Sequence, residues 1–176
     1  MSIDQKALEA LIAKDEIRDL VLLYSRGVDR KDATLLRTLY TRDGVDNHGD
    51  NFQGSADDYV AFLVNAFSFI RYSGHHVCNH LISVDVEKGE GEGEVYVAAW
   101  HVLPDGKNGW IEDLMLVRYL DHYAREDGRW RFARRDVTFD MRTIRPHEPH
   151  REAGDLFADL SYDLLSSPLF ARGVRS

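Results

Sequence analysis

The chain has 176 residues and a mass of 20.2 kDa, with 44% hydrophobic and 30% charged residues. This composition is typical of one folded domain and excludes a disordered, collagenous or low-complexity chain. A net charge of −8 and the lack of a bilayer-length apolar run argue against nucleic acid and membranes as partners. The single cysteine, Cys78, has no partner for an internal disulfide and no secretory leader is recognisable, so we expect a cytoplasmic protein.

The first part of the chain has the periodicity of helices. Apolar residues recur at helical spacing over residues 4–28, which predicts one long helix. Asp32 is a suitable N-cap for a second, short helix through residue 40, and residues 45–48 are expected to be extended. Ser55 and Asp58 resemble a capping box and predict an amphipathic helix that begins after Ser55 and continues to residue 69. Three helices are thus expected before the first long strand.

The second part of the chain has the character of strands. β-branched and apolar residues predict four strands, over residues 76–86, 94–103, 114–125 and 130–139, the last two joined by a hairpin turn. This order predicts an α+β domain with helices on one face of a curved sheet. We assign residues 1–144 to that domain and residues 145–176, with a short helix, to an extension of it. The apolar end of this extension is expected to be packed and not free in solution.

Three histidines, His75, His76 and His80, suggest a metal site at first reading. Their apolar neighbours favour a strand, on which His76 and His80 lie about 13 Å apart at ~3.3 Å per residue. That separation is too wide for two ligands of one zinc ion, which bind at ~2 Å. We therefore expect no metal, and we expect His75 to be the most exposed of the three.

Other polar residues are candidates for a site between the helices and the sheet. His101 shares a strand face with small apolar residues, so it is either a hydrogen-bonded core residue or a group facing a cavity. Arg134 and Arg135 point to opposite faces of their strand, so one guanidinium faces inward and needs an anionic partner. Asp29, which follows the first helix, is either a cap, a solvated carboxylate or a site residue.

Several of these segments resemble one family. The sequence YSRGVDRKD at 24–32, HVCN at 76–79 and DGRWRFARR at 127–135 are similar in order and spacing to the SnoaL-like branch of the nuclear transport factor 2-like superfamily. The likeness covers roughly residues 8–139. It implies a cone-shaped α+β barrel, in which three N-terminal helices pack on a curved, mostly antiparallel sheet.

The same resemblance implies a site. Scytalone dehydratase and hexachlorocyclohexane dehydrochlorinase, two members of this superfamily, pair an aspartate after the first helix with a histidine on a later strand. Asp29 and His76 match those positions as catalytic residues, without a metal or organic cofactor. His101 and Arg135 match residues of the cavity wall. The remaining substrate-binding candidates are Asn47 and Tyr24.

Two departures from the family pattern bear on the substrate. Val28 and Asn47 stand where scytalone dehydratase has tyrosines, so scytalone itself is not the expected substrate. The resemblance implies a lyase of the dehydratase or dehydrohalogenase type, or an isomerase, that acts on a small, cyclic, largely apolar substrate.

Two other readings stay open at this stage. One is a non-catalytic small-ligand-binding or assembly module of the same fold. The other is a subunit similar to the small chain of ring-hydroxylating dioxygenases. The resemblance also implies a homo-oligomer, either a trimer or a dimer.

Overall fold

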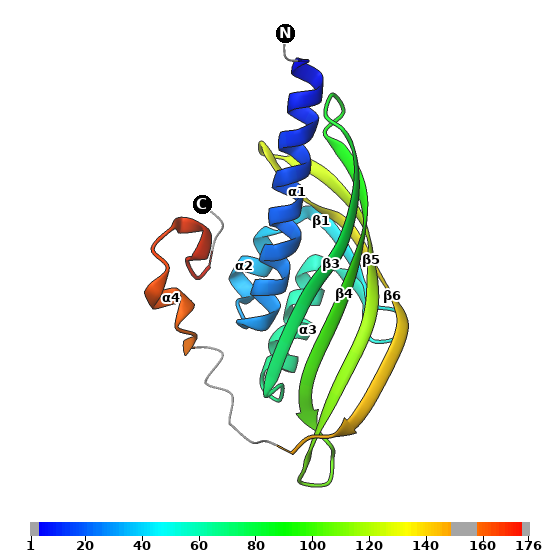
Figure 1. The fold of residues 1–176 in the computed structure, drawn as a ribbon, viewed down its shortest axis with the longest axis vertical. Helices are drawn as coiled ribbons and strands as arrows, with labels where there is room; N and C mark the ends of the chain where they lie inside the picture. The colour runs from blue at the N-terminus through cyan, green and yellow to red at the C-terminus, as the bar shows by residue number, and fades with distance from the viewer. Residues whose placement is uncertain (1–3, 149–157, 174–176) are drawn as a thin grey trace.

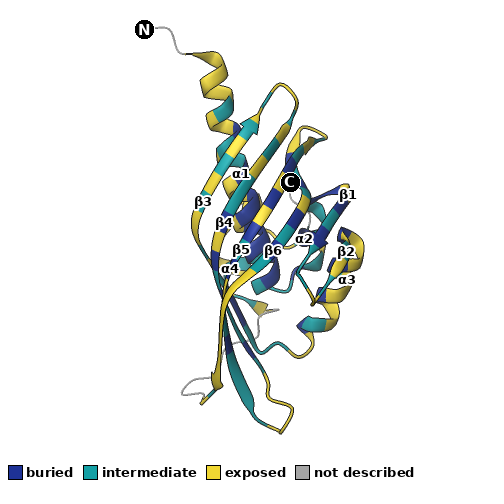
Figure 2. Ribbon diagram, turned by 90° about the vertical axis from the view of Figure 1, so that its right-hand side faces the viewer, coloured by how far each residue is buried: buried dark blue, intermediate teal, exposed yellow. Residues whose placement is uncertain are grey.

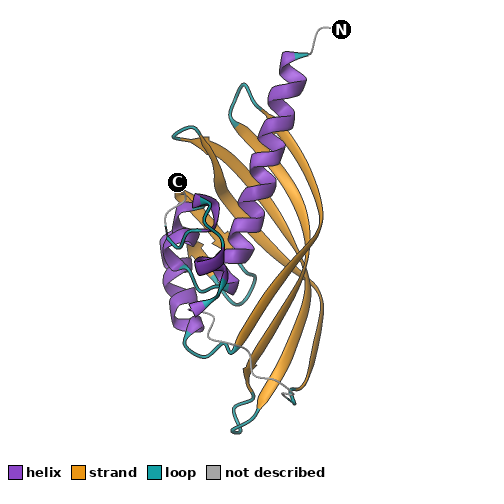
Figure 3. Ribbon diagram, turned by 60° about the vertical axis from the view of Figure 1, so that its left-hand side comes forward, coloured by secondary structure: helices purple, strands orange, loops and turns teal. Residues whose placement is uncertain are grey.

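The structure is a computed structural model that describes residues 4–148 and 158–173. Helices lie on one side of a single curved sheet, and the α+β fold class is confirmed (Figures 1 and 3). The elements in chain order are α1 (Gln5–Asp29), α2 (Ala33–Thr38), β1 (Tyr40–Asn47), β2 (Gln53–Ser55), α3 (Ala56–Phe67), β3 (Tyr72–Asp85), β4 (Glu90–Pro104), β5 (Trp110–Glu126), β6 (Arg129–Pro146), α4 (Ser161–Leu164) and the 3-10 helix η2 (Pro168–Phe170).

The long first helix forms as the sequence predicts. The side chain of Asp4 caps its first turn, accepting a hydrogen bond from the backbone N–H of Lys6 at 3.0 Å. Ile17, Leu20 and Val21 are fully buried against the sheet. The first turns project past the sheet and are exposed (Figure 2). The part of α1 from Ala13 onward therefore contributes to the core, and this part leads to Asp29.

The helices that follow differ from expectation in their boundaries. Asp32 caps α2 through the backbone N–H of Leu35 at 3.0 Å, but the helix ends at Thr38 because Tyr40 begins β1. The Ser55 hydroxyl caps α3 through the backbone N–H of Asp58 at 3.2 Å, as the capping box predicts. The extended segment is thus longer than expected and reaches the sheet.

Six strands form one sheet in the order β2-β1-β6-β5-β4-β3. All neighbours are antiparallel except β1 and β6, which are parallel, so the sheet is mostly antiparallel. Buried and exposed residues alternate along its long strands, with the buried ones toward the helices (Figure 2). The predicted core residues Tyr119, Tyr123, Trp130 and Phe132 are buried. The space between helices and sheet is therefore lined largely by aromatic and β-branched side chains.

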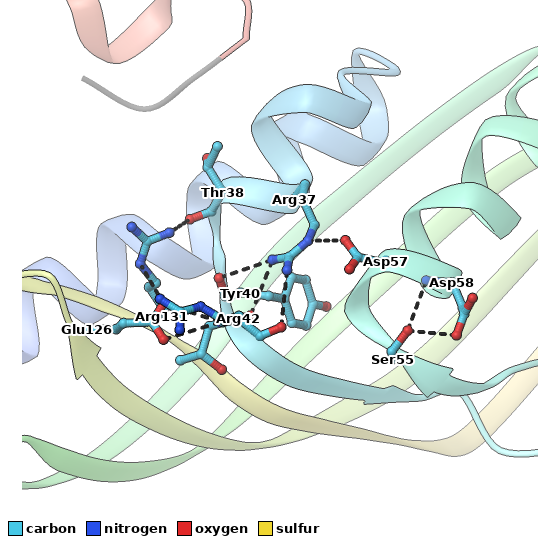
Figure 4. A network of polar contacts seen from close by, with 10 residues as sticks. Arg37, Thr38, Tyr40, Arg42, Ser55, Asp57, Asp58, Glu126 and Arg131 are labelled. Atoms are coloured by element: carbon cyan, nitrogen blue, oxygen red, sulfur yellow. Dashed lines mark hydrogen bonds and ion pairs between the residues drawn. The ribbon is translucent and has the colours of Figure 1, made fainter.

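A polar network fixes α2 and β1 to their neighbours (Figure 4). The Arg37 guanidinium pairs with Asp57 at the start of α3 and donates to the carbonyl oxygen of Arg42 at 3.2 Å. The Arg131 guanidinium of β6 donates to the carbonyl oxygen of Thr38 at 2.6 Å. These bonds satisfy the carbonyl groups at the end of α2 and fix the direction in which β1 enters the sheet.

The described part of the C-terminal extension, residues 158–173, lies against the end of α1 (Figures 1 and 3). The Arg26 guanidinium donates to the carbonyl oxygen of Phe170 at 2.9 Å, and Arg30 pairs with Asp159 at 2.9 Å. The expected amphipathic piece around residues 156–165 begins outside the described residues. No described helix has the length and hydrophobicity needed to cross a membrane.

Candidate active site

The carboxylate of Asp29 lies at the end of α1, where it meets the start of β3. Its Oδ1 accepts hydrogen bonds from Ser73 Oγ at 2.9 Å and from His75 Nδ1 at 2.7 Å. Its Oδ2 accepts a third from the backbone N–H of His75 at 2.9 Å. Ser73 and His75 are two residues apart, so their side chains share the face of β3 that meets α1. Three donors on one carboxylate hold the end of the helix against the strand.

The structure pairs Asp29 with His75, so the expected contact with His76 is wrong, as is the expected exposure of His75. The His75 side chain is 8% exposed, whereas His76 is an exposed residue on the opposite face. The cause is a β-bulge: between Val77 and His80, β3 advances three residues while β4 advances two. In a regular strand His76 would share the inward face of Ile82 and Val84, because these positions are an even number of residues apart. The extra residue of the bulge turns His76 outward and His75 inward.

The protonation of this pair follows from its surroundings. Burial raises the pKa of Asp29, but the hydrogen bonds and charge of His75, with Ser73, outweigh burial and lower the pKa below its ordinary value. An ionised Asp29 accepts the proton of His75 Nδ1, so a neutral His75 carries its lone pair on Nε2. Among the described residues no hydrogen-bond partner of Nε2 is found. His75 therefore has the arrangement of a general base.

His101 lies beside this pair on β4. Its ring meets the His75 ring edge to face, with centroids 5.2 Å apart. Burial and then the charge of His75 lower the pKa of His101 to about 4, so the ring is neutral at pH 7. His101 Nδ1 is buried and, among the described residues, has no hydrogen-bond partner. A neutral imidazole with unused hydrogen-bonding capacity stands next to the candidate base.

An ion pair between buried Asp113 and exposed Arg142 continues the polar row across the sheet. Asp113 of β5 lies opposite His101 in the ladder and is 1% exposed. Arg142 of β6 donates to it through Nε at 2.8 Å and through Nη2 at 2.5 Å. The Asp113 charge favours the protonated form of His101, although burial outweighs it. Asp29, His75, His101 and Asp113 thus form a row of polar side chains along one end of the inner face.

Of the two neighbouring arginines, Arg134 and Arg135, Arg135 faces inward, and the expectation that one of them does so is confirmed. It is fully buried and donates to both oxygens of Asp121, each at 2.7 Å. Its guanidinium lies 4.1 Å from the ring centres of Tyr24, Tyr119 and Phe132. Within the described residues its Nη1 has no hydrogen-bond partner. The structure therefore places Arg135 in the aromatic layer, with no contact to the Asp29 pair.

Two further predicted site residues are engaged elsewhere. Tyr24 hydrogen-bonds through its hydroxyl to the hydroxyl of Tyr59 of α3 at 2.5 Å. Asn47 donates to Asp136 Oδ1 at 2.9 Å and accepts from the backbone N–H of Gly49 at 3.0 Å. In the β1–β6 ladder Asn47 pairs with Asp136, whereas the buried pair Asp46 and Arg135 lies one position earlier on the inner face. Neither residue contacts the Asp29–His75 pair.

Several residues of this region were not predicted from the sequence, although the position of His75 carries a signal. Ser73 and His75 share a strand face because they are two residues apart, and the family-like aspartate is a natural partner for both. Nothing local indicates Asp113 or its arginine, because strand register alone brings them beside His101.

The surroundings of the pair give no sign of a bound ion. Within the described ranges no three His, Cys, Asp or Glu side chains are grouped to hold a metal ion. Two hollows of about 420 and 460 Å³ share Ser83, Glu92 and His122, which are exposed on the outer face of the sheet, and do not include the Asp29–His75 pair.

Comparison with solved structures shows the same fold. A candidate scytalone dehydratase from Novosphingobium aromaticivorans is 25% identical, with a TM-score of 0.68, and the match covers 82% of this chain and 97% of that one. A hexachlorocyclohexane dehydrochlorinase of type 3 from Novosphingobium barchaimii is 20% identical, with a TM-score of 0.70 and coverage of 84% and 99%. A protein of unknown function from Mycobacterium tuberculosis is 20% identical, with a TM-score of 0.62 and coverage of 74% and 73%.

A search of the curated proteins gave no match. The model of one protein family, the SnoaL-like domain, matches residues 9–136, which is most of the chain. This range begins in α1 and ends in β6, so it contains both members of the Asp29–His75 pair. The resemblance inferred from the sequence is confirmed, and the chain belongs to the SnoaL-like domain family.

Proposed function

We propose that this protein is a cofactor-independent lyase, of the dehydratase or dehydrohalogenase type, or an isomerase. The observation that carries the proposal is the Asp29–His75 contact of 2.7 Å, with Nε2 of the imidazole left unpaired among the described residues. Family membership and the likeness to a candidate scytalone dehydratase support the reaction class. The substrate in this proposal is a small, cyclic, largely apolar carbonyl compound that reaches Nε2 of His75.

His75 performs the first chemical step. Nε2 removes a proton from the carbon next to the substrate carbonyl, and Asp29 stabilises the imidazolium that forms. The reference pKa of histidine, ~6.5, is close to neutral pH, where a base both is unprotonated and accepts a proton readily. Elimination then follows when a group on the next carbon departs, and isomerisation follows when the proton returns elsewhere.

Two further side chains assist the substrate oxygen and the leaving group. The neutral ring of His101 is close enough to His75 to hydrogen-bond an enolate oxygen formed there. The Nη1 group of Arg135, which has no partner in the described structure, is available to an oxygen or halide of the substrate. Both roles are parts of the proposal, and neither requires a metal or organic cofactor.

Three cyclohexane derivatives test the proposal through one product. Dehydration of 3-hydroxycyclohexanone, dehydrochlorination of 3-chlorocyclohexanone and isomerisation of cyclohex-3-enone all give cyclohex-2-enone. We expect turnover of at least one compound, and we expect Asp29→Asn and His75→Gln to lower kcat/KM by ~10²–10⁴-fold. His76→Gln is the matched control, because it removes the adjacent, exposed imidazole and should leave kcat/KM unchanged.

Other outcomes would contradict the proposal in different ways. Full activity in both Asp29→Asn and His75→Gln would exclude the pair as the catalytic base. A loss confined to His76→Gln would restore the prediction made from the sequence. Binding of the ketones without conversion by the unaltered protein would favour the alternative, a non-catalytic small-ligand-binding module.

The expected homo-oligomer has one supporting feature. Leu116, Leu120 and Met141 are exposed to between 38% and 51% on the outer face of β5 and β6. A cluster of this kind on a sheet face is typical of a surface that another chain covers. We propose self-association through this face, and sedimentation of the purified protein as a monomer would contradict it.

A further inference from the structure

A second aspartate–histidine pair lies at the end of β1, away from the candidate base. Asp46 is fully buried and accepts hydrogen bonds from the Tyr40 hydroxyl at 2.5 Å and from Nδ1 of His48. The other ring nitrogen of His48, Nε2, lies 3.2 Å from the Tyr59 hydroxyl, and the two rings are stacked. The Tyr59 hydroxyl in turn lies 2.5 Å from the Tyr24 hydroxyl.

An unbroken chain of hydrogen bonds therefore connects Asp46, His48, Tyr59 and Tyr24. We call this chain the tyrosine relay. As a carboxylate, Asp46 accepts the Nδ1 proton of His48, so Nε2 of the neutral ring accepts from Tyr59, which accepts from Tyr24. When His48 gains a second proton, each of these bonds reverses and a proton moves inward. The relay has two complete bonding patterns, and each satisfies its buried hydroxyls.

The two ends of the tyrosine relay have different surroundings. The His48 side chain is 19% exposed, whereas Tyr59 and Tyr24 are 2% and 1% exposed, so solvent meets the relay at His48. At the inner end, the Tyr24 ring carries the guanidinium of Arg135 on its face. This guanidinium has a buried Nη1 group with no hydrogen-bond partner among the described residues, so its donor capacity is unused.

Tyr24, the inner end of the relay, lies on α1, the helix that also carries Asp29. Tyr24 precedes Asp29 by five residues on α1, a rise of about 7.5 Å. Both side chains are turned toward the sheet, where Tyr24 meets Tyr119 and Asp29 meets His75. Asp29 and Tyr24 thus face the sheet from successive turns at the end of α1.

We propose that the tyrosine relay is a proton supply and that Tyr24 is the catalytic acid for the leaving group. This inference rests on the proposed function. His75 Nε2 takes the proton from carbon, the carbon–carbon double bond forms, and the bond from carbon to the leaving oxygen breaks. The oxygen takes the Tyr24 proton and departs as water. For this step His48 is first protonated on both nitrogens: the imidazolium gives its Nε2 proton to Tyr59, and Tyr59 gives its own to Tyr24. Solvent then restores the proton of His48 and accepts the proton that His75 releases.

The leaving group provides the test of this role. Hydroxide is a poor leaving group and needs a proton as it departs, whereas chloride departs as a stable anion without one. We expect Tyr24→Phe to lower kcat on 3-hydroxycyclohexanone by ~10²–10⁴-fold and to change kcat on 3-chlorocyclohexanone little. Tyr59→Phe, which interrupts the relay and keeps the stacked ring, should show the same selectivity to a smaller extent.

Tyr40→Phe is the matched control. It removes one buried hydroxyl from the same network, on Asp46, but it leaves the bonds from His48 to Tyr24 in place. We expect it to preserve the ratio of the two activities. Equal losses on both substrates in Tyr24→Phe and Tyr59→Phe, or the same selectivity in Tyr40→Phe, would overturn the relay and leave a structural network.

A second measurement does not depend on turnover. In the ¹⁵N spectrum of the histidine-labelled protein, neutral His48 should carry its proton on Nδ1, and Tyr59→Phe should shift the Nε2 signal. A neutral His48 protonated on Nε2 would overturn the relay while leaving His75 untouched. Loss of activity in His75→Gln together with unselective Tyr24→Phe would overturn the relay alone. Full activity in Asp29→Asn and His75→Gln would remove the proposed function and the relay together.

Discussion

The two aspartate–histidine pairs of this protein have the same internal bond and different surroundings. In both, a carboxylate Oδ1 meets Nδ1 of an imidazole. Asp29 and His75 come from a helix and a distant strand, whereas Asp46 and His48 lie two residues apart. The Nε2 atom of His75 has no partner in the described structure, and that of His48 meets a tyrosine hydroxyl.

This difference teaches that the bond to the carboxylate does not define the role of a histidine. The carboxylate fixes the tautomer and the orientation of the ring. The group that meets the other nitrogen decides whether the ring can accept a proton from a ligand or only exchange one with a neighbour. The comparison leads to four predictions.

The largest expected effect distinguishes the two aspartates by stability. Asp46 is fully buried and accepts from two side chains, so Asp46→Asn replaces acceptor oxygens by a donor that faces other donors. We expect a loss of about 3 kcal/mol in the free energy of unfolding. Asp29 has a side chain that is 14% exposed, so Asp29→Asn should cost only about 1 kcal/mol. Urea denaturation measures both, and equal losses would contradict the ranking.

An acid titration of stability examines the surroundings of the first pair. Burial lowers the pKa of His101 to about 4, so between pH 6.5 and 4 the unfolded chain binds a proton that the folded chain does not. The free energy of unfolding should therefore decrease as the pH is lowered from 6.5 to 4, and His101 should account for about 2–3 kcal/mol of the decrease.

A matched pair of variants assigns this acid sensitivity. His101→Asn should remove most of the slope of unfolding free energy against pH. Burial also lowers the pKa of His80 to about 4, but His80 is less enclosed, so His80→Asn should remove less. An unchanged slope in His101→Asn would show that the ring is solvated in solution.

A smaller effect is expected from the hydroxyl that supports the first pair. Ser73→Ala removes one of the three donors on the Asp29 carboxylate, so the pKa of Asp29 should rise and stability should fall by about 1 kcal/mol. A carbon NMR titration of the Asp29 carboxyl measures the pKa. Ser25→Ala is the control, since that hydroxyl bonds to the carbonyl oxygen of Val21 instead. A pKa that stays constant in Ser73→Ala would contradict the role of Ser73.

The smallest expected effect tests whether the side chain of His76 is exposed, as it is in the structure. His76→Ala removes an exposed side chain, so the free energy of unfolding should change by less than about 0.5 kcal/mol. Thermal unfolding monitored by circular dichroism is sufficient. A loss above about 2 kcal/mol would mean that His76 and not His75 faces the helices.

Much of the fold is predictable from the sequence because its signals are local. Asp32 and Ser55 cap α2 and α3 as predicted, and helical periodicity predicted the extent of α1. The strand boundaries were predicted less well, since partners decide them. β6 extends to Pro146 because β5 begins at Trp110 and offers a partner along that whole length.

The candidate site is predictable only in part, for a geometric reason. Asp29 and His101 were named because they match family positions, and for His101 strand period also indicated an inward face. His75 was missed because the family match was placed on its neighbour His76, and the bulge that turns His75 toward Asp29 has no signal in the sequence. The Asp46–His48 pair was missed because the tyrosines beyond it, Tyr59 on α3 and Tyr24 on α1, are brought together only by the fold.

The docking of the C-terminal segment has a practical consequence for handling the protein. Gly173 donates its backbone N–H to the Asp32 carboxylate at 2.8 Å, three residues after Asp29. A fluorescent protein or an affinity tag fused beyond this point would emerge beside the loop that positions Asp29. The opposite end of the polypeptide extends past the edge of the sheet (Figure 1). Immobilisation on a sensor chip and labelling for single-molecule work should therefore use the amino-terminal end.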